Sequence, residues 1–408
     1  MNFKHLSGIL ALFLILTTPL LGAIEYRLED FEKQQTKSNF GLVTVQGASF
    51  FKGGISPDFN LGPLGVGVDL NLYVPLSSSK NYPPDLNSVV LRMLSYTHDN
   101  MAGIKFGWLR NVTFGYGLLM DKYDSGSGGS TEFNTSKAGI MGYLNFFPYR
   151  VDAMWTIGNV KAVRGCYTIP DTFLLGSSLI FGANYVTDTD GLSYSPDGSA
   201  ATITRPSKQG LSIDAGAPIG GDFLTLFAEH ARLAGTGENL DKAKAGTAAG
   251  FKGTFFGQVD YRLDYRSLQA GFAPSYFNNT YEGTGFNDNQ NLPKTDLSGF
   301  LGLISTSIME DYIKAGFEYE AYQGKDPLIT AAAGWRQIAG TVGVINYTIP
   351  FQGKQNATMK MDILYMTGGV LDYVVSLKRT YLTLDTFMES YGVAVRFNAS
   401  KLIPGLPF

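Results

Sequence analysis

Apolar and polar residues alternate along much of this chain. From Leu64 to Val74 every second residue is apolar, and Asp69 and Asn71 lie on the other face. In Val259–Arg266, four charged residues alternate with four apolar residues. Successive side chains of a β-strand point to opposite faces, so this spacing predicts strands with one apolar and one polar face. A helix would scatter the same charges around its whole surface.

The same alternation recurs in Tyr312–Ala321, Met359–Tyr365 and Leu371–Lys378. Further candidate strands centre near Val45, Leu91, Ile104, Phe114, Leu144, Ala153, Ile180, Ile213, Leu226, Phe251, Leu303, Ala332, Val344 and Val395. Turn-rich segments separate the strands, and we expect them to be loops: Ser77–Pro84, Asp121–Ser136, Thr187–Gln209, Gly235–Lys244 and Asn278–Lys294. No composition break or linker divides the chain, which predicts a single folded domain.

Composition and strand length distinguish a membrane barrel from a soluble β domain. Charged residues make up only 16% of the chain, against roughly 25% in soluble domains. Leu64–Val74 and Leu174–Tyr185 reach the roughly 9–11 residues that a membrane strand needs. We therefore predict an all-β fold, a transmembrane antiparallel up-and-down β-barrel of about 16 strands, with about 14 and about 18 as alternatives. A secreted β domain, such as a lectin or adhesin, is the competing interpretation.

The N-terminus has the parts of a secretory signal. Lys4 precedes an apolar run, Leu6–Leu16, and Pro19 and the small residue Ala23 follow it. We predict a signal peptide over residues 1–23, cleaved near Ala23, because the run is too short for a spanning helix. Residues 24–39 are charge-dense and are expected to form a periplasmic segment, and residues 40–408 the barrel.

A strand near the end of the chain carries a recognisable sequence motif. Ser390, Gly392, Val395 and Phe397 occupy the polar, glycine, hydrophobic and aromatic places of an eight-residue strand. This segment resembles the final-strand signal of bacterial outer-membrane β-barrel proteins of the porin-like kind. The resemblance implies a place in the outer membrane of a Gram-negative-type envelope, with membrane lipids and the barrel-assembly machinery as partners. The chain departs from that pattern because residues 398–408 follow the motif.

Charge and residue counts argue against several other functions. The formal net charge of −3 gives no basic surface for nucleic acid. Cys166 is the only cysteine, so an internal disulfide is excluded. His98 and His230 lack the neighbours of a catalytic histidine, and Asp188–Asp197 lacks the spacing of a calcium loop. We expect no enzyme activity, no metal and no cofactor.

The charged faces of two strands carry the functional prediction. In a barrel they point into the lumen, and the predicted pore-lining residues are Asp260, Arg262, Asp264, Arg266, Lys314, Glu318 and Glu320. A wide lumen would make the chain a porin-like channel for passive diffusion of small hydrophilic solutes. A lumen filled by salt bridges, or by an inward-folded Asp121–Ser136 loop, would favour a structural or surface-interaction barrel. A transporter of hydrophobic molecules is a third hypothesis, and a homo-oligomer is left open.

Overall fold

The computed structural model describes most of the chain after the N-terminal segment. The described residues are 37–45, 48–56, 58–75, 88–125, 138–171, 176–189, 192–193, 203–204, 207–278, 281, 293–308, 312–338, 340–349, 357–367, 371–381 and 387–397. The predicted signal peptide, residues 1–23, lies outside this part, as do residues 24–36 and 398–408. No helix among the described residues is long and apolar enough to cross a membrane.

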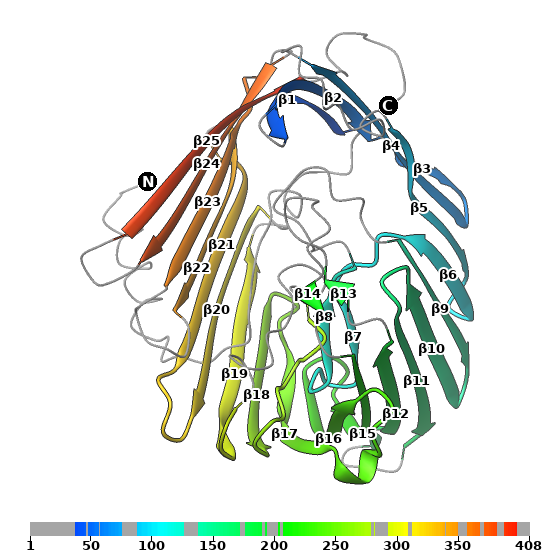
Figure 1. Cartoon of the computed structure of the whole chain (residues 1–408). Helices are drawn as coiled ribbons and strands as arrows, with labels where there is room; N and C mark the ends of the chain where they lie inside the picture. The colour runs from blue at the N-terminus through cyan, green and yellow to red at the C-terminus, as the bar shows by residue number, and fades with distance from the viewer. Residues whose placement is uncertain are drawn as a thin grey trace.

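One antiparallel sheet of 21 strands forms the wall of the molecule (Figure 1). Its strands are β1 (Lys37–Val45), β2 (Ala48–Ser56), β3 (Asp58–Leu61), β4 (Leu64–Pro75), β5 (Ser88–His98), β6 (Ala102–Gly107), β9 (Gly139–Phe146), β10 (Tyr149–Thr156), β11 (Val160–Ile169), β12 (Leu179–Asp188), β15 (Lys208–Ile219), β16 (Leu224–Gly235), β17 (Lys244–Phe255), β18 (Val259–Leu268), β19 (Leu297–Ile308), β20 (Ile313–Tyr322), β21 (Leu328–Ile338), β22 (Thr341–Ile349), β23 (Thr358–Tyr365), β24 (Leu371–Tyr381) and β25 (Phe387–Phe397). Two short pairs lie outside this sheet: β7 (Val112–Phe114) with β8 (Met120–Tyr123), and β13 (Leu192–Ser193) with β14 (Ile203–Thr204).

The wall has up-and-down topology. Successive wall strands pair antiparallel, and both β2 and β3 pair with β4. The sheet curls into a barrel that brings its first and last strands, β1 and β25, near each other (Figure 1). Among the described residues, no strand pairing joins β1 to β25. The predicted fold class is confirmed, although the strands outnumber the about 16 expected from the usual barrel sizes. The pattern in β11 is one reason, because Lys161 and Arg164 place a charge on each of its faces and hide the alternation.

The outer face of the barrel is apolar. Tyr265 of β18 is 46% exposed and lies opposite Phe300 of β19, which is 53% exposed. Asp264 and Arg266, which flank Tyr265 in the sequence, are buried on the other face. Other large apolar side chains exposed on the wall strands include Trp155, Phe181, Ile213, Phe251, Tyr373 and Val393. An apolar surface of this extent is unfavourable in water and matches the lipid-facing band of a membrane barrel. The sidedness therefore agrees with a transmembrane barrel rather than a soluble sandwich.

Two segments of the chain fold into the barrel. The first is residues 109–125, between β6 and β9, and it contains the β7–β8 hairpin (Figure 1). The second is residues 269–278 with Tyr281, between β18 and β19. We call these two segments the inner plug. Backbone bonds join them: Ser275 N donates to Leu118 O over 2.8 Å, and Asp121 N donates to Phe277 O over 3.1 Å.

The inner plug has an apolar core that packs against the inside of the wall. Its fully buried side chains include Leu118, Leu119, Met120, Tyr123, Phe272, Tyr276, Phe277 and Tyr281. Glycines in the wall leave space for them. A Cβ at Gly210 would lie 2.5 Å from Cδ1 of Leu119, and a Cβ at Gly246 would overlap the ring of Phe272. Because interiors are close-packed, these two glycines allow the inner plug to approach β15 and β17.

Candidate functional site

A cavity of about 520 Å³ lies between the inner plug and the inner face of β17–β21. Charged residues from the wall and the plug line it: Asp121, Lys122, Asp222, Lys252, Asp260, Arg262, Arg266, Glu318 and Glu320. Leu301, Leu303 and Leu328 add apolar surface. A cavity with charges of both signs is suited to hydrated, polar solutes.

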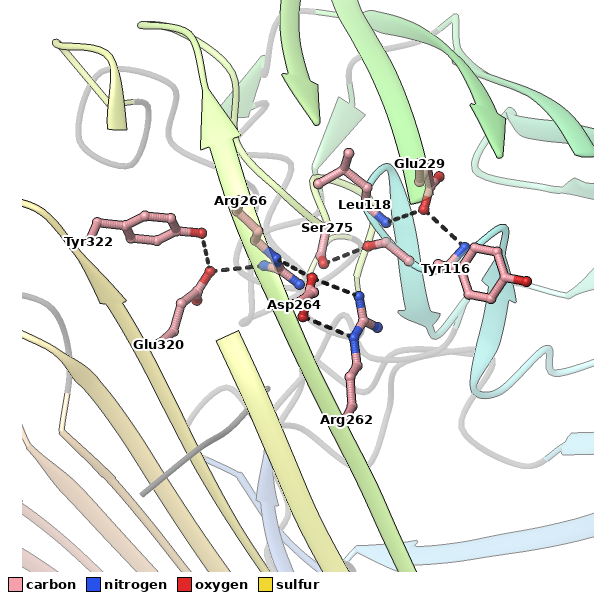
Figure 2. Close-up of polar contacts among 10 residues, drawn as sticks. Tyr116, Leu118, Glu229, Arg262, Asp264, Arg266, Ser275, Glu320 and Tyr322 are labelled. Atoms are coloured by element: carbon pink, nitrogen blue, oxygen red, sulfur yellow. Dashed lines mark hydrogen bonds and ion pairs between the residues drawn. The ribbon is translucent and has the colours of Figure 1, made fainter. Parts of the chain in front are cut away.

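An ion-pair network covers the wall beside the cavity (Figure 2). Asp264 is fully buried and accepts hydrogen bonds from two arginines, with Arg262 Nη2 at 3.1 Å and Arg266 Nε at 3.0 Å. Arg266 Nη1 also donates to Glu320 Oε1 over 2.9 Å, and the hydroxyl of Tyr322 donates to the same oxygen. The residues alternate along β18 and β20, which places all five side chains on the inner face. Pairing compensates the cost of removing these charges from water, and it fixes their positions.

Two cations, one of them Arg262 of this network, lie beside aromatic rings. The ring of Tyr116 stacks on the ring of Phe227, with centroids 4.5 Å apart. Lys252 Nζ lies 4.9 Å from the centroid of the Tyr116 ring, and the guanidinium of Arg262 lies 5.1 Å from that of Phe227. Attraction between a cation and the face of a ring holds such groups in place. The stack therefore places Lys252 and Arg262 where the inner plug meets the wall.

A carboxylate of the wall holds the inner plug. Glu229 of β16 is 1% exposed, and its Oε2 accepts hydrogen bonds from Tyr116 N at 2.9 Å and Leu118 N at 3.0 Å. Gly115 and Gly117 have φ angles of +68° and +84°, a left-handed conformation that glycine adopts without strain. Their turns direct two backbone N–H groups at one oxygen, as in an anion-binding nest.

Tyr116 is fixed at its other end as well. Its hydroxyl occupies space that a Cβ at Gly216 would need. Burial, together with the nearby charge of Asp214, raises the pKa of Tyr116 to about 12. The hydroxyl therefore stays protonated and neutral at physiological pH.

A second ion pair lies on the inner wall near the inner plug. Arg164 of β11 makes two hydrogen bonds to the carboxylate of Asp214, at 2.8 and 2.9 Å. Arg164 Nε also donates to the thiol of Cys166 over 3.0 Å, so the only cysteine faces the interior. Asp214 lies directly opposite Glu229 on the neighbouring strand. Arg164 thus neutralises one of two adjacent buried carboxylates.

The structure brings together most of the predicted pore-lining residues. Asp260, Arg262, Arg266, Glu318 and Glu320 line the cavity, and Asp264 pairs with two of the arginines. Lys314 lies on β20 with Glu318 but is not among the lining residues.

Sequence reasoning missed other residues of the site. Lys252 lies in a strand where glycines interrupt the alternation, and Asp121 and Lys122 belong to a segment expected to be a loop. Nothing in the local pattern around Glu229 indicates that it binds a backbone more than a hundred positions away.

Other residues singled out in the sequence do not line the cavity. Ser390, Gly392, Val395 and Phe397 lie on β25, the last described strand. His230 forms a hydrogen bond with Thr247 on the neighbouring strand β17, with 2.9 Å between Nδ1 and Oγ1. Within the described residues, no group of three or more His, Cys, Asp or Glu side chains is arranged to hold a metal ion. Most of the Thr187–Gln209 segment lies outside the described residues.

Comparison with known proteins gives only distant similarities. No family model matches the chain, and no curated protein matches it. The chain is similar to the siderophore receptor PirA from Acinetobacter baumannii, with a TM-score of 0.39 and 10% identity over 90% of this chain and 80% of that one. A mutant of the ferric enterobactin receptor PfeA from Pseudomonas aeruginosa gives a TM-score of 0.37 and 9% identity, over 89% and 80% of the two chains. A mutant of Rh. blastica porin gives 0.30 and 10%, over 89% and 98%. The apolar outer face and the antiparallel wall are the features that mark this chain as a membrane barrel.

Proposed function

We propose that this protein is an outer-membrane channel for the passive diffusion of small hydrophilic solutes, narrowed by the inner plug. The observation that carries the proposal is the charged cavity between the plug and β17–β21, inside a wall whose outer face is apolar. Opposed charges in a narrow passage orient polar solutes and replace part of their hydration shell. The final-strand motif and the signal-like N-terminus support an outer-membrane location.

The inner plug supplies the size limit in this proposal. Its apolar core packs on the inside of the wall and excludes solvent from that side of the barrel. The hydrogen bonds from Tyr116 and Leu118 to Glu229 fix the plug to β16. A fixed plug makes the passage narrow and lined by defined charges, which favours small solutes over large ones.

The test is conductance of the purified full-length protein in planar lipid bilayers. We expect discrete current steps in KCl. In a salt gradient, Lys252→Glu is expected to move the reversal potential towards cation selectivity, because it replaces a cation of the cavity by an anion. Lys314→Glu is the matched control, since it makes the same change on the inner wall away from the cavity. Absence of current steps from protein that shows heat-modifiable gel migration would overturn the proposal.

A structural or surface-interaction barrel is the second candidate. The observation that favours it is the inward fold of residues 109–125, which include the first part of the Asp121–Ser136 segment. In that function the cavity would be a closed pocket and the bilayer would carry no current. Transport of hydrophobic molecules is less well supported, because charged side chains dominate the lining of the cavity.

A further inference from the structure

Two buried polar atoms on paired residues of β20 and β21 have no hydrogen-bond partner among the described residues. They are Oε2 of Glu318 and Oγ1 of Thr330. Glu318 is 1% exposed and Thr330 is 3% exposed, and the two residues lie directly opposite each other on β20 and β21. A buried carboxylate oxygen without a partner is unfavourable, so a group that donates hydrogen bonds is favoured here. Glu318 also lines the cavity, where a solute can supply that donor.

The other end of the cavity carries two adjacent cations. Lys252 and Arg262 lie directly opposite each other on β17 and β18, and both line the cavity. Asp264 neutralises Arg262 in part, but Asp264 is shared with Arg266. Asp121 of the inner plug also lies near Lys252 and lines the cavity. Two adjacent cations attract an anionic group. A solute carboxylate placed at this end would relieve the repulsion between Lys252 and Arg262.

The residues at the two ends of the cavity belong to one row of cross-strand partners in the wall. The cross-strand partners along the row are Lys252, Arg262, Leu303, Glu318 and Thr330. Neighbouring strands are roughly 4.8 Å apart, so the backbones at Arg262 and Glu318 are about 10 Å apart. Leu303 places an apolar side chain between them. A solute that satisfies both ends therefore has its opposite charges several bonds apart, with an apolar middle.

Solutes with one charge fit this row less well. An anion alone leaves Glu318 and Thr330 without a donor, and a cation alone leaves Lys252 and Arg262 repelling each other. An α-amino acid with a neutral side chain carries both charged groups on the same carbon and is too short. From this geometry we infer that the cavity binds small zwitterions whose carboxylate contacts Lys252 and Arg262 and whose ammonium group contacts Glu318 and Thr330. The inference rests on the proposed channel function and names its solute class: ω-amino acids, dipeptides and amino acids with a cationic side chain.

Equilibrium binding tests this inference without requiring a current. Isothermal titration calorimetry would be done on the full-length protein in detergent, with 6-aminohexanoate as probe and hexanoate and glycine as comparison ligands. We expect 6-aminohexanoate to bind at least about tenfold more tightly than either comparison ligand, because it alone satisfies both ends of the row. Glu318→Gln is expected to weaken its binding about tenfold, and Lys252→Gln by a similar factor. Hexanoate binding should change less than about twofold in Glu318→Gln.

Lys314→Gln is the matched control, because it removes a charge from β20 away from the cavity and should leave binding unchanged. Thr330→Val serves in place of Glu318→Gln if that variant does not show heat-modifiable migration. Equal binding of 6-aminohexanoate and hexanoate, or tight binding that survives both substitutions, would overturn the inference even if the protein conducts. Tight, Glu318-dependent binding by a protein that carries no current would support the zwitterion site and refute the channel.

Discussion

Removal of the Glu229 carboxylate is expected to release the inner plug from the wall. In Glu229→Ala, the N–H groups of Tyr116 and Leu118 lose their acceptor in a site where the carboxylate was 1% exposed. Hydrogen bonds to a charged group contribute about 1.5–3 kcal/mol each. Loss of both bonds therefore costs about 3–6 kcal/mol before other changes are counted.

One change opposes this loss. Asp214 lies directly opposite Glu229, so the substitution removes a repulsion between two buried carboxylates. Arg164 already neutralises Asp214 through two hydrogen bonds, and the relief is therefore smaller than the loss. We therefore expect Glu229→Ala to destabilise the closed position of the plug by about 3 kcal/mol. This corresponds to about a hundredfold increase in the equilibrium constant for opening of the plug.

Hydrogen exchange measured by mass spectrometry gives a local readout of this opening. Peptides that contain Tyr116 and Leu118 should exchange about a hundredfold faster in Glu229→Ala and about tenfold faster in Glu229→Gln, which keeps a neutral acceptor. Single-channel conductance should likewise rise more in Glu229→Ala than in Glu229→Gln. His230→Ala is the control, because His230 is the next residue of β16 and bonds to Thr247 instead of the plug. Unchanged exchange at these amides in Glu229→Ala would refute the role of the carboxylate.

Three further substitutions test the packing and the ion-pair network. Gly246→Val should displace Phe272 and make the inner plug sensitive to protease, whereas Ala249→Val on the outward face of the same strand should not, as limited proteolysis would show. Arg266→Met leaves Glu320 without its arginine and should lower the free energy of unfolding by about 3–5 kcal/mol, measured by urea titration in lipid vesicles. The double change with Glu320→Gln should recover part of that loss, and a strictly additive result would refute the pairing.

The sequence by itself determined the wall. In β18, the alternation from Asp260 to Arg266 separates an inner charged face from an outer apolar one, and the structure shows Tyr265 outside with Asp264 buried inside. Alternation is a local property of the backbone, because residues two apart on a strand share a face wherever the strand lies. The antiparallel all-β fold and the inward direction of Arg262, Glu318 and Glu320 were therefore within the reach of the sequence pattern.

The inner plug and the cavity were decided only by the tertiary structure. Residues 109–125 and 269–278 have no period of their own, and their mutual bonds join positions more than a hundred and fifty apart. Glu229 acts as a tether only because β16 passes beside Gly115–Leu118, and Gly246 matters only because Phe272 packs on it. Lys252 becomes part of a charged row only when β17 pairs in register with β18. These contacts depend on which segments meet after the barrel has curled, and that information is not contained in the spacing of residues along any one strand.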